Sequence, residues 1–306
     1  MNHDQPERLN RNYELVTCQT PDTVKLHGLF QAACDDDAPV DAAVILHGLG
    51  GNCYSSSLNL RLADALRDSG IAVVLGNTRG HDGISMSPVS GRAQTIGAAY
   101  EIVDDCKNDV AGWVNWLVEK KGYEKIALVG HSLGAIKSLY AYANLPDDTG
   151  KVHEAVRMII GLSATRLCHG QFLNSNRADD FRKWYDKAVS LVEAGRQQEL
   201  MQVEFPFPTH MAAAAYRDKY GPEDRYDWTQ YVDQIDVPIL LLFGERELAD
   251  NAAFHGLLDQ VNEIANQHRN FQVEVIESAN HFYAGVHWRA TDAIQTWLRE
   301  NSQLQD

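Results

Sequence analysis

The sequence has few positive charges and no long apolar run, and both absences limit the classes of partner. Lys and Arg total 27 against 42 Asp and Glu, which gives a formal net charge of −15 over 306 residues. Nucleic acids and anionic membranes attract clustered Lys and Arg, so we expect neither as a partner. No apolar stretch reaches the roughly 18 residues that span a bilayer, and residues 1–11 lack the apolar core of a secretory signal. The sequence therefore predicts a cytoplasmic protein without a membrane span.

Cysteine is also scarce, and its placement is irregular. The five cysteines are scattered along the chain and form no CxxC pair. Disulfide frameworks and zinc ribbons require paired, regularly spaced cysteines, so the sequence predicts free thiols and neither of these structures. The tight acidic run at residues 35–37 is interpreted as a solvated loop rather than as a metal site. We therefore expect no bound metal.

Short apolar runs alternate with helical segments along most of the chain. The run at residues 42–46 is short and continuously apolar, which is typical of a strand covered on both faces in a parallel sheet. Two earlier strands, residues 13–17 and 24–30, are predicted to pair as a hairpin. The alternation predicts an α/β fold with a mostly parallel central sheet flanked by helices. The predicted buried strands are residues 42–46, 71–75 and 125–129, and further strands are predicted at residues 156–162, 238–243 and 271–276. The predicted helices are residues 55–69, 104–120, 135–143 and 291–300.

Residues 163–236 interrupt this alternation. They contain no convincing buried strand, they are helical in pattern, and they carry eleven aromatic residues. Some 70 residues are too many for a structureless connection in a compact domain. We therefore predict a helical insertion that divides a core formed by residues 1–162 and 237–306. Peripheral packing of these helices is one interpretation, and a cap over a pocket is the other, which the aromatic content favours.

A serine between glycines marks the start of one predicted helix. Residues 130–134 read Gly-His-Ser-Leu-Gly and join the strand at 125–129 to the helix at 135–143. A turn this tight crowds the backbone, so the flanking positions must lack bulk. The turn presents the Ser132 hydroxyl clear of the strand, beside the free N–H groups of a helix N-terminus. We predict that Ser132 is a nucleophile rather than part of a purely structural turn.

A second glycine-rich segment, residues 47–51, reads His-Gly-Leu-Gly-Gly and directly follows the strand at 42–46. An oxyanion hole needs backbone N–H groups that no side chain obstructs, and glycines permit this. We predict that the N–H groups of Leu49 and Leu133 are the two donors. A phosphate-binding loop is the alternative, but the segment lacks both GxGxxG spacing and the lysine of a P-loop.

A nucleophilic serine requires a base, and the base requires a carboxylate to orient it. Among the twelve histidines, His281 follows the strand at 271–276, where a strand-end loop returns it to Ser132. Each acid after the strand at 238–243 would give the order serine, acid, histidine along the chain. Three carboxylates compete for that role: Glu245, Glu247 and Asp250.

These motifs resemble those of the α/β-hydrolase superfamily of serine hydrolases, and the resemblance covers nearly the whole chain. The matching segments are the serine turn at residues 130–134, the glycine-rich loop at residues 47–51, and a strand-end acid followed by Asn280 and His281. In that family the acid commonly takes the last position of a Gly-x-x-Asp pattern, which is Glu247 here. The resemblance implies the α/β-hydrolase fold, Glu247 as the acid, and the insertion as a cap.

The predicted function is that of a serine hydrolase acting on an ester of a small, partly apolar molecule. Ser132 attacks the carbonyl carbon, His281 accepts its proton and later protonates the leaving group, and Glu247 orients His281. Water activated by His281 then releases the acid, so no organic cofactor is implied. Three alternatives remain: cleavage of a thioester, amide or carbon–carbon bond by the same residues, a cofactor-free lyase or perhydrolase, and a binding protein without catalysis.

The insertion supplies the predicted substrate contacts. Phe205 and Phe207 alternate with Pro206 and Pro208, and the prolines break any helix and leave a loop. We predict that Phe205 and Phe207 reach the pocket over Ser132, where aromatic rings favour an apolar or aromatic group of the substrate.

Overall fold

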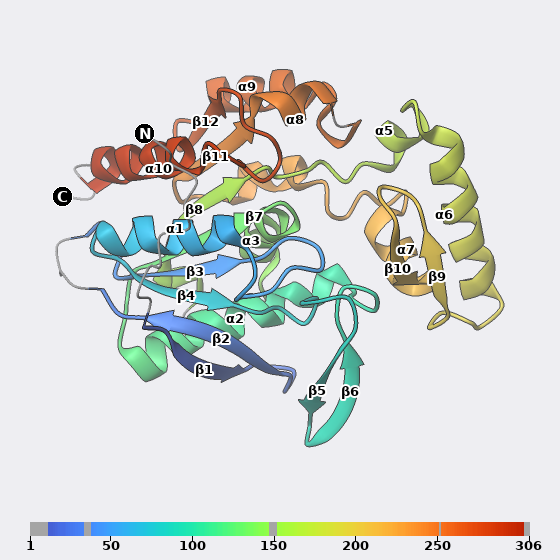
Figure 1. The fold of residues 1–306 in the computed structure, drawn as a ribbon, viewed down its shortest axis with the longest axis horizontal. Coiled ribbons are helices and arrows are strands. Elements are labelled where there is room, and N and C mark those ends of the chain that lie inside the picture. Colours follow the sequence, from blue (N-terminus) through green and yellow to red (C-terminus); the bar gives the residue numbers. More distant parts are fainter. Residues whose placement is uncertain (1–11, 34–37, 147–151, 251, 303–306) are drawn as a thin grey trace.

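An eight-stranded sheet forms the centre of the fold in the computed structural model, which describes residues 12–33, 38–146, 152–250 and 252–302 (Figure 1). In sheet order, its strands are β1 (Glu14–Gln19), β2 (Lys25–Gln31), β4 (Ala72–Gly76), β3 (Ala42–Leu46), β7 (Ile126–His131), β8 (Val156–Leu162), β11 (Ile239–Gly244) and β12 (Phe271–Ile276). β2 pairs antiparallel with β1 and with β4, and the other pairings are parallel. The predicted α/β fold with a mostly parallel central sheet is confirmed.

Alternate side chains of the central strands enter two separate hydrophobic layers. In β3, Ala42, Val44 and Leu46 belong to one layer, whereas Ala43 and Ile45 belong to the other. A strand buried on both faces has no polar alternation, which explains its continuous apolar sequence. The second layer is covered by α1 (Ser57–Asp68) and α10 (His287–Ser302), and the first by α2 (Cys106–Trp116), α3 (Leu133–Asn144) and α9 (Leu257–Gln267) (Figure 1).

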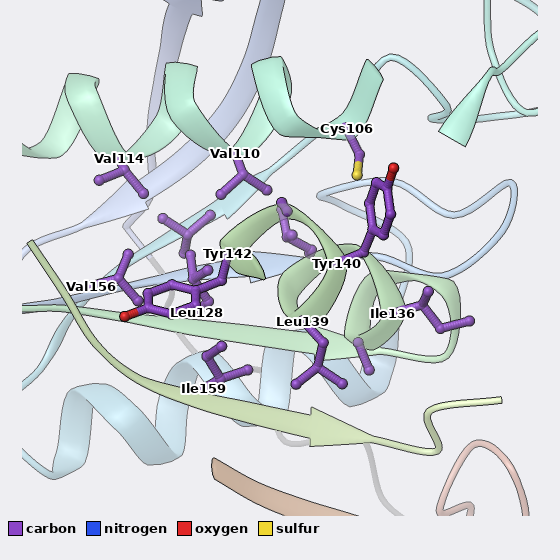
Figure 2. Close-up of a cluster of buried hydrophobic side chains, with 14 of the residues drawn as sticks. Cys106, Val110, Val114, Leu128, Ile136, Leu139, Tyr140, Tyr142, Val156 and Ile159 are labelled. Atoms are coloured by element: carbon purple, nitrogen blue, oxygen red, sulfur yellow. The ribbon is translucent and has the colours of Figure 1, made fainter. Parts of the chain in front are cut away.

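Helix α3 lies almost entirely inside the protein. Figure 2 shows its side chains Ile136 and Leu139 among those of α2, β7 and β8. All ten residues from Leu133 to Tyr142 are buried, so the helix is covered on every side. A helix packed on all sides belongs to the core rather than to the surface. The N-terminus of α3, where it meets β7, is therefore held firmly in place.

One β-hairpin was not predicted from the sequence. β5 (Ser85–Val89) pairs antiparallel with β6 (Arg92–Ile96), and the pair extends away from the central sheet (Figure 1). Four of the five residues of β6 are exposed, so the strand carries no apolar alternation that a sequence pattern could reveal. Ser90 and Gly91, with φ of 48° and 78°, form the two-residue turn that such hairpins favour.

The insertion between β8 and β11 is not entirely helical, which corrects the expectation of a segment without strands. It contains a second hairpin, whose strands are four residues long and pair with each other outside the main sheet. Strands this short are too brief for a recognisable period-2 pattern. The elements of the insertion are α5 (His169–Leu173), α6 (Ala178–Glu193), β9 (Leu200–Val203), β10 (Thr209–Ala212), α7 (Ala213–Tyr220) and η3 (Trp228–Gln234).

The remaining short elements connect these layers. The helix predicted at residues 104–120 is observed as α2, with the short 3-10 helix η1 before it and the π-helical turn η2 after it. Within the described ranges, no helix combines the length and the apolar character needed to cross a membrane. The acidic run at residues 35–37 and the polar start at residues 1–11 lie outside the described residues. The short elements are η1 (Val103–Asp105), η2 (Leu117–Lys121), α4 (Val152–Ala155), α8 (Glu245–Asp250) and η4 (Ala252–Phe254).

Candidate active site

Ser132 occupies a strained turn between β7 and α3. Its backbone φ of 55° lies in the left-handed region, which residues other than glycine seldom adopt. A Cβ atom on Gly130 would lie 2.2 Å from the carbonyl oxygen of Gly134, and one on Gly134 would lie 2.4 Å from that of Leu46. Only glycine fits both positions, and the buried helix behind the turn holds Ser132 in its strained conformation.

Two later strands bring a histidine and a carboxylate to this serine. The Ser132 hydroxyl lies 3.0 Å from His281 Nε2, and His281 Nδ1 lies 2.7 Å from Glu247 Oε2. Glu247 is on α8, directly after β11, and His281 lies in the turn that follows β12. Parallel strands end at one edge of the sheet, so residues far apart in sequence meet there.

The carboxylate of Glu247 is held from both sides and is only 4% exposed. Its Oε1 accepts hydrogen bonds from the Gly244 N–H and the Ser163 hydroxyl, each at 2.7 Å, which leaves Oε2 for His281. Ser163 was not identified from the sequence. The sequence signal that could have identified it is its position directly after β8, the strand that pairs with β7.

The other two acids of this loop are placed differently. Glu245 is exposed, and its Oε2 accepts a hydrogen bond of 2.8 Å from the Ser278 N–H. The side chain of Asp250 lies outside the described part of the structure. Of the two acids whose side chains are described, it is Glu247 that reaches His281.

The loop of residues 47–51 packs against the serine. A Cβ atom on Gly48 would lie 3.2 Å from the Cβ of Ser132, so a side chain there would crowd the nucleophile. In the part of the chain that the structure describes, the N–H groups of Leu49 and Leu133 donate no hydrogen bond to other residues. Two unoccupied donors thus lie on the two segments that adjoin Ser132, as an oxyanion hole requires.

Two buried histidines support these loops in their neutral form. His131 Nε2 donates a hydrogen bond of 2.7 Å to the carbonyl oxygen of His281, and burial, followed by the adjacent His281, lowers the pKa of His131 to about 3. Burial, followed by the ammonium of Lys137, lowers the pKa of His47 to about 4. Both imidazoles are therefore uncharged at neutral pH.

Comparison with known proteins identifies the fold. The alpha/beta hydrolase fold family matches residues 42–200. The chain belongs to this family. Among solved structures, this hydrolase-fold chain is similar to Est1E from Butyrivibrio proteoclasticus with bound ferulic acid (TM-score 0.63, 15% identity, 93% of this chain and 98% of that one). It is also similar to DcsB in complex with a substrate analogue (TM-score 0.66, 14% identity, 95% and 100%).

Curated relatives match the hydrolase-fold chain over a shorter stretch. Human lipase member K is 31% identical over 122 residues, which is 38% of this chain and 30% of that lipase. Human lysosomal acid lipase/cholesteryl ester hydrolase is 27% identical over 115 residues, 37% of this chain and 29% of that enzyme. The matches therefore span about 30% of the length of these relatives.

The two phenylalanines predicted to contact substrate differ in environment. Phe205 is only 2% exposed, and its ring packs against Phe172, Phe181 and Tyr220 inside the insertion. This corrects the expectation that Phe205 faces an open pocket, because the insertion needs the ring for its own core. Phe207 is 48% exposed and has no place in that core.

A third phenylalanine lies beside the site and was not identified from the sequence. The Phe282 ring is 61% exposed, and its centroid lies 5.1 Å from that of His281 and 5.7 Å from that of His131. Its position directly after His281 was the signal that a pattern search could have used. Among the described residues, no group of three or more His, Cys, Asp or Glu side chains is arranged to hold a metal ion.

Proposed function

We propose that this protein is a serine hydrolase that cleaves an ester bond of a small, partly apolar molecule through an acyl-enzyme intermediate. The observation that carries the proposal is the continuous hydrogen-bonded series Ser132–His281–Glu247 at the carboxyl ends of the strands. The names of the lipases that match part of the chain support an ester as the substrate.

The first half of the reaction forms the acyl-enzyme. The Ser132 Oγ attacks the ester carbonyl carbon while His281 Nε2 takes its proton, and the Glu247 carboxylate stabilises the resulting imidazolium. Negative charge develops on the carbonyl oxygen, where the N–H groups of Leu49 and Leu133 receive it. The tetrahedral intermediate then collapses, and His281 gives its proton to the departing alkoxide, so that an alcohol leaves.

The second half of the reaction reverses these roles. His281 removes a proton from water, and the hydroxide attacks the acyl carbon that is bound to Ser132. The same two N–H groups hold the second oxyanion. Collapse of this intermediate returns the proton to Ser132 and releases the carboxylic acid.

The insertion, residues 163–236, is proposed to be a cap that selects the substrate. Leu49 in the glycine-rich loop and Leu167 at the start of the insertion both pack against the insertion's own hydrophobic cluster, which places that cluster next to the loop. His281 protonates the leaving alcohol, so the alcohol passes the side of His281. The exposed Phe282 ring beside His281 is therefore proposed to contact an apolar alcohol group.

Covalent labelling tests the proposed function. A fluorophosphonate should react with the wild-type protein, and mass spectrometry should find the adduct on Ser132. Ser132→Ala should prevent labelling and lower ester turnover by roughly 10⁴–10⁶-fold while the protein stays folded. A panel of matched esters, thioesters and amides should show the ester as the best substrate. Near-normal turnover in folded Ser132→Ala would refute the proposal, and faster thioester or amide cleavage would replace the proposed bond with that one.

A further inference from the structure

Three charged residues are buried together at the junction of the core and the insertion. Lys137 on α3, Glu101 before η1 and Lys219 on α7 are each at most 3% exposed. Lys137 Nζ lies 2.5 Å from Glu101 Oε1, and Lys219 Nζ lies 3.8 Å from Glu101 Oε2. Lysine is seldom fully buried, and here two ammonium groups share one carboxylate. Such a cluster is costly to desolvate, so stability alone is a weak reason for it.

The cluster is joined to the glycine-rich loop by hydrogen bonds. Lys137 Nζ donates to Thr78 Oγ1 at 2.9 Å, and the Thr78 N–H donates to His47 Nε2 at 3.1 Å. Because Nε2 is the acceptor, Nδ1 carries the proton of the neutral imidazole. That Nδ1–H donates to the carbonyl oxygen of Gly48 at 2.8 Å.

The last bond of this series ends on the peptide group that carries a proposed oxyanion donor. The carbonyl of Gly48 and the N–H of Leu49 belong to one peptide unit, which is planar and trans. In such a unit the C=O and the N–H point in opposite directions. A hydrogen bond that fixes the carbonyl oxygen therefore also fixes the direction of the Leu49 N–H, and it polarises that N–H toward the oxyanion.

Burial and the neighbouring charges keep Glu101 ionised and His47 neutral, as this series of hydrogen bonds requires. Burial alone would raise the pKa of Glu101, but the ammonium groups of Lys137 and Lys219 together hold it below its ordinary value. The carboxylate therefore stays ionised between them. Burial, followed by the Lys137 charge, lowers the pKa of His47 and keeps it neutral, so His47 Nε2 remains free to accept the Thr78 N–H.

The insertion is fixed to the same segment on either side of Glu101. The Ala212 N–H donates to the carbonyl of Ala99 at 2.7 Å, and the Val103 N–H donates to Asp218 Oδ2 at 3.0 Å. Lys219 follows Asp218 on α7, so its ammonium reaches Glu101 from the insertion. The position of α7 is thereby connected to the charged cluster.

We propose that Lys137 is a positioning residue that orients the Leu49 N–H through Thr78 and His47, with Glu101 and Lys219 linking this series to the insertion. The inference rests on the proposed function, since it concerns the proposed oxyanion donor. It deepens that proposal by assigning a role to a buried cluster that the triad does not use.

Matched esters and thionoesters separate this role from simple packing. A thionoester places the developing charge on sulfur, which is larger than oxygen and accepts hydrogen bonds weakly, so a well-oriented donor favours the ester. Lys137→Met should lower kcat for the ester by roughly 10–100-fold, less than the loss of a whole oxyanion donor, with little change in KM. The ratio of ester to thionoester kcat should fall by about the same factor. In this variant the Lys219 ammonium, 3.8 Å from Glu101 Oε2, remains as the counter-charge of that carboxylate.

Thr78→Val provides a second route to the same measurement. It removes the hydroxyl, which accepts from Lys137 and lies 3.3 Å from His47 Nε2, but keeps the backbone N–H that donates to the same Nε2. The ratio should therefore fall by a smaller factor. Thr78→Ser keeps a hydroxyl at this position, so its ratio of ester to thionoester kcat should stay close to that of wild type. An unchanged ratio in both Lys137→Met and Thr78→Val, or in Thr78→Val alone if Lys137→Met does not fold, would overturn the inference. Failure of the wild type to label at Ser132 would instead overturn the proposed function.

Discussion

The choice among three neighbouring carboxylates illustrates how single contacts decide a role. The sequence places Glu245, Glu247 and Asp250 within six consecutive residues, and their spacing alone does not separate them. In the structure, Glu247 is enclosed by a backbone N–H and the Ser163 hydroxyl and points at His281, whereas Glu245 is exposed. Two fixed donors on one oxygen restrict the carboxylate, which compensates for the extra rotatable bond of glutamate relative to aspartate.

Amide substitutions should separate the two acids. Glu247→Gln removes the negative charge beside His281 and presents an amide in its place, so kcat should fall by about 10²–10⁴-fold. Glu245→Gln, the matched control, should stay within a few-fold of wild type because that side chain contacts Ser278 and not His281. Steady-state ester hydrolysis measures both. A larger loss in Glu245→Gln than in Glu247→Gln would contradict the proposed triad.

Ser163 offers a milder test of the same carboxylate. Ser163→Ala removes one of the two donors to Oε1, and one hydrogen bond to a charged group amounts to roughly a tenfold or larger loss of kcat. Ser163 has a φ of 53°, so Ser163→Gly removes the hydroxyl while suiting the backbone better. Similar kcat losses in the two variants would assign the effect to the hydroxyl. Loss in the alanine variant alone would assign it to backbone strain.

Phe282 should influence selectivity for the alcohol part of the ester and not for the acyl part. Phe282→Ala removes the exposed ring beside His281, so kcat/KM should fall more for esters of large apolar alcohols than for methyl esters of the same acid. Once the alcohol has left, the acyl-enzyme no longer meets this residue, so the deacylation rate should not change. Pre-steady-state kinetics separate the two steps. A change confined to deacylation, or to acyl-chain preference, would place Phe282 on the acyl side instead.

At the scale of secondary structure, prediction from sequence succeeded where burial leaves a local pattern. The central strands are covered on both faces, so their apolar runs gave bounds within two residues of those observed, as for β3, β4 and β11. The serine turn was equally readable, because close backbone approach requires glycine at fixed positions. The two hairpins were missed because their strands are exposed or only four residues long.

The loop between β9 and β10 shows the limit of composition as a guide to role. Pro206 and Pro208 correctly indicated a break in helix, but the same sequence does not say which ring turns inward. The Phe205 ring lies in an aromatic group, edge-on to Phe172 and tilted against Phe181, whereas Phe207 is exposed. The side that a ring takes depends on residues 15 or more positions away, such as Tyr220 and Phe181, which no local pattern contains.

Truncation to alanine should therefore lower the free energy of unfolding much more at Phe205 than at Phe207. Phe205→Ala opens a cavity in the insertion's core and should lower the free energy of unfolding by about 3–5 kcal/mol. Phe207→Ala removes an exposed ring and should change it by less than about 0.5 kcal/mol. Urea unfolding followed by intrinsic fluorescence measures both. Equal destabilisation by the two substitutions would mean that the hairpin loop packs differently from the arrangement described.

At the scale of the whole molecule, the features that sequence analysis missed are those built from contacts between distant segments. Lys137 and Glu101 are 36 residues apart, and Lys219 reaches them from within the insertion. A lone lysine in the apolar run at residues 135–143 was a signal, since such a residue must either be exposed or find a buried partner. The identity of that partner depends on the packing of three separate elements.

Acid sensitivity is a property of the whole fold that follows from its neutral buried histidines. In the unfolded chain, His47 and His131 have pKa values near 6.5, whereas in the folded protein burial lowers them to about 4 and about 3. Between these values the unfolded state binds protons that the folded state does not, so stability falls as pH decreases below about 6.5. From pH 7 to pH 5, each histidine should remove about 2 kcal/mol from the free energy of unfolding.

His131→Asn tests this expectation, because the Asn amide still has a donor for the His281 carbonyl but does not titrate. The decrease in unfolding free energy between pH 7 and pH 5 should be smaller in this variant than in wild type by about 2 kcal/mol. His210→Asn is the matched control, since His210 is exposed and its replacement should leave the decrease unchanged. Urea unfolding at the two pH values gives the difference directly, and it does not depend on any overall loss of stability in the variant. The same pH dependence in wild type and His131→Asn would show that carboxylates, rather than buried imidazoles, set the acid limit of the fold.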